Sequence, residues 1–372
     1  MKRAIVLSGG GSKGSYEIGV WKALKKLNIK YDIVTGTSVG ALNAALMTQK
    51  TYFKAIRLWK NMCFDKVIDE EINENKVIRS YAKKIIKGGM TVNNLKKTVD
   101  NALDLNRFYS SNIDMGIITY NIKKLKPLIL TKNKIPKDKL SDYLVASASC
   151  FPAFEKKEIG DSEYIDGGYF DNLPINLAID MGADEVIAVD LKEVGKKQKV
   201  KNNNIKIITI SPKNDIGSFL VFDSKMARRA MRLGYNDTFK TFNKLDGDKY
   251  TFRLNDLKKN YKRYNLNFKY NEYIKIVEKL GAMFEIDDSY IYDIKKYNKM
   301  LISRFLKLKG DQAIKSTKIE RLKKLFNKKY IVKYLYNQID NKELPLIFKT
   351  EYKCALYMHF IMEELWKKYI DF

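Results

Sequence analysis

Ser38 lies in the pattern Gly-Thr-Ser-Val-Gly of residues 36–40, directly after the short β-branched stretch of residues 31–35. Residues 41–47 are mostly alanine and leucine, which favour a helix. Gly-x-Ser-x-Gly between a strand and a helix is typical of a nucleophile elbow, in which a tight turn exposes the serine. The pattern therefore predicts a strand, a turn at Ser38 and a helix, and an ordinary glycine-rich turn is the alternative.

The sequence does not offer Ser38 its usual partner. A catalytic serine needs a base to take its proton, most often a histidine. The single histidine, His359, lies in an apolar stretch that is expected to form a buried helix of another region. Either Ser38 is not a nucleophile, or a carboxylate serves as its base. Asp166, which precedes Gly167 and Gly168, is the candidate carboxylate, and a plain Asp-Gly turn is the alternative.

A second glycine-rich stretch, residues 8–14, directly follows the apolar residues 4–7 and precedes a helical pattern at residues 15–27. Glycines bring backbone N–H groups close to a substrate oxygen, and the N-terminus of the following helix favours negative charge. This loop is therefore a candidate for stabilising an oxyanion. Lys13 either has a structural role or faces an anionic group of the substrate.

The same loop matches Gly-x-Gly-x-x-Gly through Gly9, Gly11 and Gly14, which is the dinucleotide-binding fingerprint. That function requires an acidic residue at the end of the second strand, whereas Asp32 lies at its beginning. A phosphate-binding P-loop requires Gly-Lys followed by serine or threonine, but here the lysine precedes the glycine. Both interpretations as a phosphate site are therefore disfavoured.

Strand and helix patterns alternate over residues 3–210, which predicts an α/β domain with a mostly parallel sheet. Within it, residues 50–108 are expected to be mainly helical, and residues 115–120 and 125–131 to form two strands joined by a basic turn. Residues 218–242 predict a helix of the same domain.

From about residue 257 onwards, apolar residues recur on helical faces. We therefore expect an α/β domain over residues 1–250 and a basic, all-helical C-terminal region over residues 251–372. With 372 residues, of which 45% are hydrophobic, the chain can bury a sizeable core in both parts.

Composition narrows the class of protein. No apolar run approaches the roughly 18 residues that span a membrane, and Met1 leads into the first strand without the apolar stretch of a secretory signal. The three cysteines are widely spaced, which fits free thiols in a cytosol. A cytoplasmic protein is expected, although an effector exported by a dedicated secretion system has the same features. One histidine and no ligand-spaced cluster disfavour a metal site.

The net charge is +27, and most of it is carried by residues 191–372. A basic half can meet an anionic membrane surface or nucleic acid. A composition rich in lysine, asparagine, isoleucine and tyrosine explains the same charge without any binding role. Peripheral contact with an anionic membrane is retained as a hypothesis, and no nucleic-acid partner is expected.

In combination, four motifs resemble the patatin-like phospholipase family. They are Gly-Gly-Gly-Ser-Lys-Gly at residues 9–14, the serine pattern at residues 36–40, residues 146–154, and Asp-Gly-Gly at residues 166–168. Each motif is common by itself, whereas the four in this order are specific. The resemblance covers residues 3–191, extends weakly to about residue 242, and does not include the C-terminal region. Glu155 is a departure, because many members have a proline there.

The resemblance implies a three-layer α/β/α fold and a Ser-Asp dyad that needs no metal or other cofactor. It makes Ser38 the nucleophile and Asp166 its base, and it places the oxyanion hole at the backbone of Gly9, Gly10, Gly11 and Ser12. The expected substrates are fatty-acyl esters of glycerophospholipids or lysophospholipids, cleaved through an acyl-enzyme. A catalytically silent lipid- or membrane-binding adaptor on the same fold is the alternative.

Overall fold

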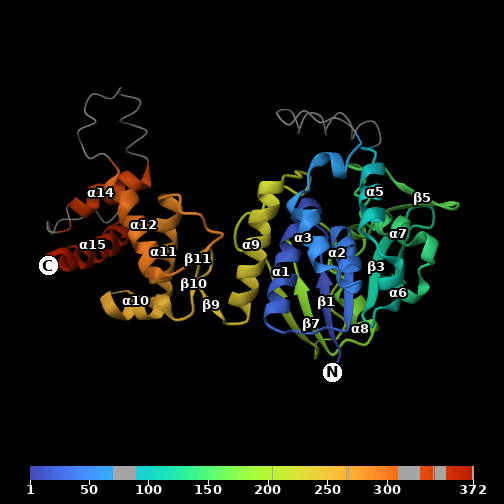
Figure 1. Ribbon diagram of the computed structural model, residues 1–372, viewed down its shortest axis with the longest axis horizontal. Coiled ribbons are helices and arrows are strands. Elements are labelled where there is room, and N and C mark those ends of the chain that lie inside the picture. The colour runs from blue at the N-terminus through green and yellow to red at the C-terminus, as the bar shows by residue number, and fades with distance from the viewer. Residues whose placement is uncertain are drawn as a thin grey trace. The chain divides into compact units, whose positions relative to one another are not determined.

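The computed structural model divides the chain into two compact units, Met1–Thr238 and Phe239–Phe372 (Figure 1). It describes residues 1–69, 89–202, 204–264, 266, 268–308, 327–337, 339 and 349–370. The division falls twelve residues before the boundary expected at residue 250, because the strand at Leu245–Asp246 pairs with a strand of the second unit.

A mixed sheet forms the centre of the first unit. Its strands are β1 (Arg3–Leu7), β2 (Ile33–Thr37), β3 (Asp114–Asn121), β4 (Lys126–Thr131), β5 (Lys157–Ile159), β6 (Ser162–Asp166), β7 (Glu185–Val189) and β8 (Lys206–Ile210). The order is β5-β6-β3-β2-β1-β7-β8, with β4 paired to β3. The pairings from β3 through β2, β1 and β7 to β8 are parallel, and those of β4, β5 and β6 are antiparallel. The parallel centre predicted from the sequence is confirmed.

Helices cover both faces of this sheet, which is why its central strands are apolar without alternation. The helices are α1 (Ser15–Lys26), α2 (Val39–Thr48), α3 (Tyr52–Lys60), α5 (Asn93–Ala102), α6 (Leu105–Ser110), α7 (Leu140–Ser147), α8 (Ile175–Asp180) and α9 (Ser224–Thr241). All residues of β2 and β7 are buried. On one face, Ala4 and Val6 of β1 form an apolar cluster with Ala178 of α8.

Two helical predictions need comment. Residues 70–88, part of the stretch expected to be mainly helical, lie outside the described residues. The helix expected from residue 218 begins at Ser224. Residues 218 and 219 instead bind the glycine-rich loop, because their carbonyl oxygens accept hydrogen bonds from the side chain and the backbone N–H of Ser12.

The second unit is mainly helical, as expected. Its described helices are α10 (Asp256–Tyr264), α11 (Tyr270–Met283), α12 (Ile294–Leu306), α14 (Lys328–Asn337) and α15 (Lys349–Ile370). It also contains a three-stranded sheet of β9 (Leu245–Asp246), β10 (Thr251–Arg253) and β11 (Ile291–Tyr292). The expectation of an all-helical region was therefore wrong in this detail, because strands of two or three residues are too short to show an alternating pattern.

Aromatic side chains make up much of the core of the second unit. Tyr273, Tyr297 and Tyr357 are fully buried, and their hydroxyl groups have hydrogen-bond partners. Asn260 of α10 donates to the hydroxyl oxygens of Tyr273 and Tyr357 at 2.7 and 3.0 Å. In the part of the chain that the structure describes, no helix is long and apolar enough to cross a lipid bilayer.

Candidate active site

Ser38 occupies a strained turn between β2 and α2. Its backbone has φ 58° and ψ −131°, a conformation that is rare for residues other than glycine and is concentrated at functional sites. Its two flanking glycines have no room for a side chain. A Cβ atom at Gly36 would lie 2.3 Å from the carbonyl oxygen of Gly40, and one at Gly40 would lie 2.4 Å from that of Leu7. The turn therefore has the geometry of a nucleophile elbow.

The sheet brings Asp166 to this serine. Thr37, which precedes Ser38, pairs with Ile118 of β3, and Asp166 at the end of β6 pairs with the next residue, Thr119. The Asp166 carboxylate accepts hydrogen bonds from the Ser38 side chain and, at 2.7 Å, from the backbone N–H of Gly168. The two residues that the sequence singled out are therefore in contact.

Burial sets the acid–base character of Asp166. Only 5% of this residue is exposed. Burial, partly opposed by the hydrogen bonds from Ser38 and Gly168, raises the pKa of Asp166 to about 6. The carboxylate is thus ionised at neutral pH and is a stronger base than an exposed aspartate.

The segment before β6 holds both residues of this pair, a role that sequence reasoning missed. The hydroxyl oxygen of Ser147 accepts the backbone N–H of Ser38 at 3.0 Å and donates to the carbonyl oxygen of Ile118 at 2.6 Å. The backbone N–H of Asp166 donates to the carbonyl oxygen of Ser149 at 2.8 Å. Both serines belong to the segment at residues 146–154, which was noted only as a family motif.

The glycine-rich loop passes beside the nucleophile. A Cβ atom at Gly9 would lie 3.1 Å from the Cβ atom of Ser38. Among the described residues, the backbone N–H groups of Gly10 and Gly11 have no hydrogen-bond acceptor. Those of Gly9 and Ser12 donate to the carbonyl oxygens of Asn172 and Phe219, at 3.0 and 2.8 Å. Only two of the four amides expected in the oxyanion hole are therefore available to a ligand.

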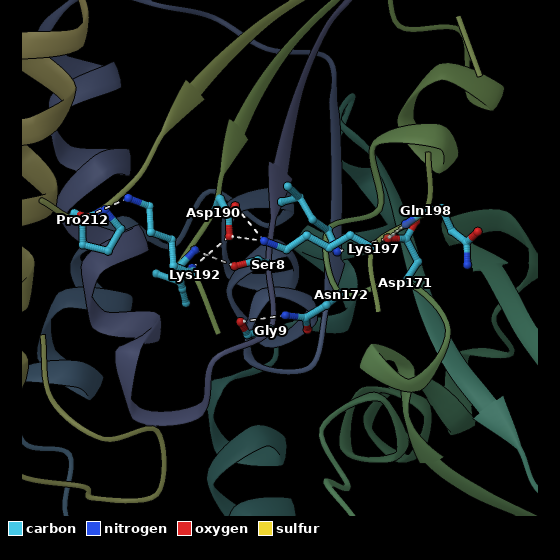
Figure 2. A network of polar contacts seen from close by, with 11 residues as sticks. Ser8, Gly9, Asp171, Asn172, Asp190, Lys192, Lys197, Gln198 and Pro212 are labelled. Carbon is cyan, nitrogen blue, oxygen red and sulfur yellow. Dashed lines mark hydrogen bonds and ion pairs between the residues drawn. The ribbon is translucent and has the colours of Figure 1, made fainter. Parts of the chain in front are cut away.

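Figure 2 shows the polar contacts that hold this loop. The side chain of Asn172 donates to the carbonyl oxygen of Gly9 at 3.4 Å. The hydroxyl oxygen of Ser8 accepts the backbone N–H of Leu191 at 2.9 Å, and Asp190 forms an ion pair with Lys197 at 2.7 Å (Figure 2). Asn172 had no distinguishing signal in the sequence, because its partner is brought to it only by the fold.

Lys13, expected either to bind substrate or to be structural, forms an ion pair with Glu193. Both side chains are largely buried, at 14% and 15% exposure. Since Glu193 occupies the ammonium group, this contact favours the structural alternative.

An apolar cavity of about 570 Å³ opens beside Ser38 and Asp166, a volume typical of small-molecule sites. Leu42 and Leu46 line it one and two turns along α2 from Ser38, and Leu95 and Val99 of α5 contribute further aliphatic surface. The cavity therefore suits a hydrocarbon chain attached to a group that reaches Ser38.

Cys150 also lines the cavity, but it does not compete as a nucleophile. Burial, together with the negative charges of Asp166 and Glu193, raises the pKa of its thiol to about 12. The reactive thiolate is therefore scarce at neutral pH.

The described residues that line the cavity include no histidine. His359 lies in α15 of the second unit, with its Nε2 atom 3.5 Å from a carboxylate oxygen of Glu363. No group of three or more histidine, cysteine, aspartate or glutamate residues is placed to hold a metal ion in the described ranges.

This fold, with its serine turn, glycine-rich loop and buried aspartate, defines the class of the first unit. Residues 5–179 match the family model of patatin-like phospholipases. This part of the chain is a patatin-like phospholipase domain.

Several curated proteins share it. The cUMP-AMP-activated phospholipase of Escherichia coli is 30% identical over 227 residues, covering 55% of this chain and 65% of that protein. The probable lipid hydrolase 463L of Invertebrate iridescent virus 6 is 27% identical over 239 residues, covering 59% and 81%. Patatin-like phospholipase domain-containing protein 7 of Rattus norvegicus is 26% identical over 204 residues, covering 50% of this chain but only 13% of the rat protein.

Proposed function

We propose that the chain hydrolyses fatty-acyl esters of glycerophospholipids or lysophospholipids, with Ser38 as the nucleophile and Asp166 as its base. The observation that carries this proposal is the hydrogen bond from Ser38 to a buried carboxylate at the wall of an apolar cavity. The relatives named as phospholipase and lipid hydrolase support the same substrate class.

In the first half of the reaction, Asp166 takes the hydroxyl proton as the Ser38 oxygen attacks the ester carbonyl carbon. The carbonyl oxygen becomes negative. As this intermediate collapses, the bond to the alcohol oxygen breaks and the alcohol leaves with the proton from Asp166. The fatty-acyl group remains on Ser38 as an ester.

In the second half, water takes the place of the alcohol. Asp166 accepts one of its protons while the water oxygen attacks the acyl carbon. The bond to the Ser38 oxygen then breaks, that oxygen regains the proton from Asp166, and the fatty acid leaves. Both residues end in their starting protonation states, so neither a metal nor a redox cofactor enters the balance.

We assign the oxyanion to the backbone N–H groups of Gly10 and Gly11. The assignment is supported because the other two amides of the loop, those of Gly9 and Ser12, already donate to carbonyl oxygens of the protein. Donors that are fixed in place before the reaction stabilise the developing charge without reorganisation, and removing one typically lowers the rate by ~100- to 1000-fold.

The test is fatty-acid release from phospholipid vesicles by wild-type protein, Ser38→Ala and Asp166→Asn. The proposal expects release by the wild type and its loss in both variants. A fluorophosphonate probe should label Ser38 in the wild type alone. Vesicle binding without turnover on any ester, and without labelling of Ser38, would overturn the proposal in favour of a silent lipid-binding adaptor.

A further inference from the structure

The cavity opens beside a lysine-rich loop, residues 192–201, which we call the docking loop. Val194 lines the cavity, yet this residue is 98% exposed. A single exposed apolar residue is ordinary on a protein surface. Val194 differs in its setting, because it stands where the cavity meets solvent.

Three more apolar residues that line the cavity are not fully buried. Tyr169, Phe219 and Leu220 also line the cavity, and Tyr169 is exposed while the other two are half-buried. Together with Val194 they form what we call the apolar rim. The rim comes from three separate segments of the first unit, which the fold brings to one cavity.

The docking loop is held in place. The backbone N–H of Lys196 donates to the carbonyl oxygen of Gly168 at 2.9 Å, and the carbonyl oxygen of Lys196 accepts the backbone N–H of Asn172 at 2.6 Å. The ion pair between Asp190 and Lys197 fixes the loop further (Figure 2). These bonds display Val194 outward from a fixed backbone beside the Asp166 segment.

The charge of the loop is strongly positive. Its lysines are Lys192, Lys196, Lys197, Lys199 and Lys201, and its one acidic residue, Glu193, is paired with Lys13. Lys197 and Lys201 have carboxylate partners. The exposed side chains of Lys196 and Lys199 have no hydrogen-bond or ion-pair partner among the described residues.

We propose that the docking loop and the apolar rim together form a surface that docks onto an anionic lipid bilayer. Val194 enters the head-group region, and Lys196 and Lys199 contact lipid phosphates. The combination favours a bilayer over a nucleic acid, because Lys196 lines the same apolar cavity as the four rim residues. The inference deepens the proposed function, since the cavity then opens toward the membrane that holds the substrate.

General magnitudes set the expected effect. Each basic residue near an anionic bilayer contributes a factor of about five in affinity. Burying a valine side chain contributes a further factor of about ten or more. Reversing the charge of two lysines should therefore weaken binding by at least about twenty-fold, and introducing a charge at Val194 by at least about ten-fold.

The experiment measures flotation with vesicles of phosphatidylcholine, with and without phosphatidylglycerol, for the full chain carrying Ser38→Ala. This background consumes no lipid, so the binding result is independent of whether the proposed hydrolysis occurs. The test variants are Val194→Asp and the double variant Lys196→Glu, Lys199→Glu.

The β3–β4 turn supplies matched controls. Leu125 is 75% exposed there between Lys124 and Lys126, and it does not line the cavity. Leu125→Asp and the double variant Lys124→Glu, Lys126→Glu therefore make the same chemical changes in another lysine-rich turn. Equal thermal unfolding midpoints would show that all variants remain folded.

The proposal expects binding that requires phosphatidylglycerol, is weakened by both docking-loop variants and is retained by both controls. Equal weakening in tests and controls would overturn it, because net charge alone would then explain the binding. No effect of the docking-loop variants, or no binding by the parent protein, would also overturn it. The same variants are also tested for binding to a single-stranded oligonucleotide. If the docking-loop variants lose that binding while their vesicle binding is unchanged, the surface would be reassigned to nucleic acid.

Discussion

Asn43 joins the helix that follows the nucleophile to the helix that follows the glycine-rich loop. Its side-chain amide donates to a carboxyl oxygen of Glu17 in α1 at 2.8 Å and to the carbonyl oxygen of Gly14 at 2.9 Å. Its own oxygen accepts the indole N–H of Trp59 at 2.9 Å. Glu17 is 1% exposed, and its other carboxyl oxygen has no partner among the described residues. This contact ties the end of the glycine-rich loop to the helix that begins directly after Ser38.

Glu17 is expected to favour its neutral form in the folded protein more strongly than in the unfolded chain. Burial raises the pKa of Glu17 well above its usual range. Because the folded pKa exceeds the unfolded one, the free energy of unfolding falls as pH rises from the unfolded pKa toward the folded pKa, by at most about 1.4 kcal/mol per pH unit. Glu17→Gln should therefore gain stability relative to wild type as the pH rises above about 4.3, the usual pKa of an unfolded glutamate. Urea unfolding at several pH values measures this, and parallel stability curves would contradict it.

Asp166 predicts the pH dependence of catalysis. In the proposed reaction Asp166 must be ionised to accept a proton, and burial raises its pKa to about 6. We therefore expect kcat/KM to fall below about pH 6, tenfold per pH unit, because this parameter reports groups of the free enzyme. A pH profile with a monomeric soluble ester measures it. A profile that stays flat down to about pH 4, the range of an ordinary aspartate, would contradict the role of a buried base.

The same raised pKa makes Asp166 unfavourable for stability. Its ionised form is penalised by burial in the folded state, so stability is lost as pH rises through about 6. Asp166→Asn should abolish activity and, at pH 8, raise the free energy of unfolding by up to about 3 kcal/mol. Below about pH 4 the gain should vanish, because wild-type Asp166 is then neutral. Denaturant unfolding at the two pH values measures it, and an equal gain at both would point to another cause.

Gly10 is expected to be required for rate more than for binding. A Cβ atom there would lie 2.7 Å from the Cδ1 atom and 3.2 Å from the Cβ atom of Leu191, which is packed at 1% exposure, so Gly10→Ala should displace the proposed oxyanion donor. We expect kcat to fall by roughly 100- to 1000-fold with little change in KM. Gly182→Ala is the control, because a Cβ atom at Gly182 meets nothing within 4 Å although its φ of 92° is strained. It should lower stability alone, and equal losses of kcat in both variants would refute the assignment.

Leu42 is expected to control acyl-chain length. It lines the cavity one turn along α2 from Ser38, so a larger side chain would block the path away from the nucleophile. Leu42→Trp should lower hydrolysis of long-chain esters at least tenfold relative to short-chain esters, because the long chain loses apolar burial. Leu105→Trp is the control, since Leu105 is 43% exposed and does not line the cavity. If Leu42→Trp left the ratio of long-chain to short-chain ester hydrolysis unchanged, the acyl chain would bind elsewhere.

The predictable parts of the site are those with local causes. Ser38 was identified from the glycines on either side, Gly36 and Gly40. A Cβ atom at either glycine would lie 2.3 or 2.4 Å from a backbone carbonyl oxygen, which explains why no other residue fits. The parallel strands were visible because buried strands are apolar throughout. These features depend on a few consecutive residues, and the structure has them where the pattern placed them.

The remaining features depend on contacts between distant segments. The carbonyl oxygens of Asn172 and Phe219 accept two amides of the glycine-rich loop and so determine which amides stay free. Ser147 supports Ser38 only after β3 and α7 pack together. The short strands β9, β10 and β11 leave no period in the sequence. Tertiary contacts of this kind carry no local pattern, so sequence reasoning could not find them.

The central claim is that Ser38 acts as a nucleophile with Asp166 as its base. Fatty-acid release from mixed phospholipid vesicles, compared for wild type, Ser38→Ala and Asp166→Asn with fluorophosphonate labelling of the same samples, tests it most directly. The account predicts release and labelling at Ser38 in the wild type, and neither in Ser38→Ala nor in Asp166→Asn. Release that persists in folded Ser38→Ala protein would contradict it.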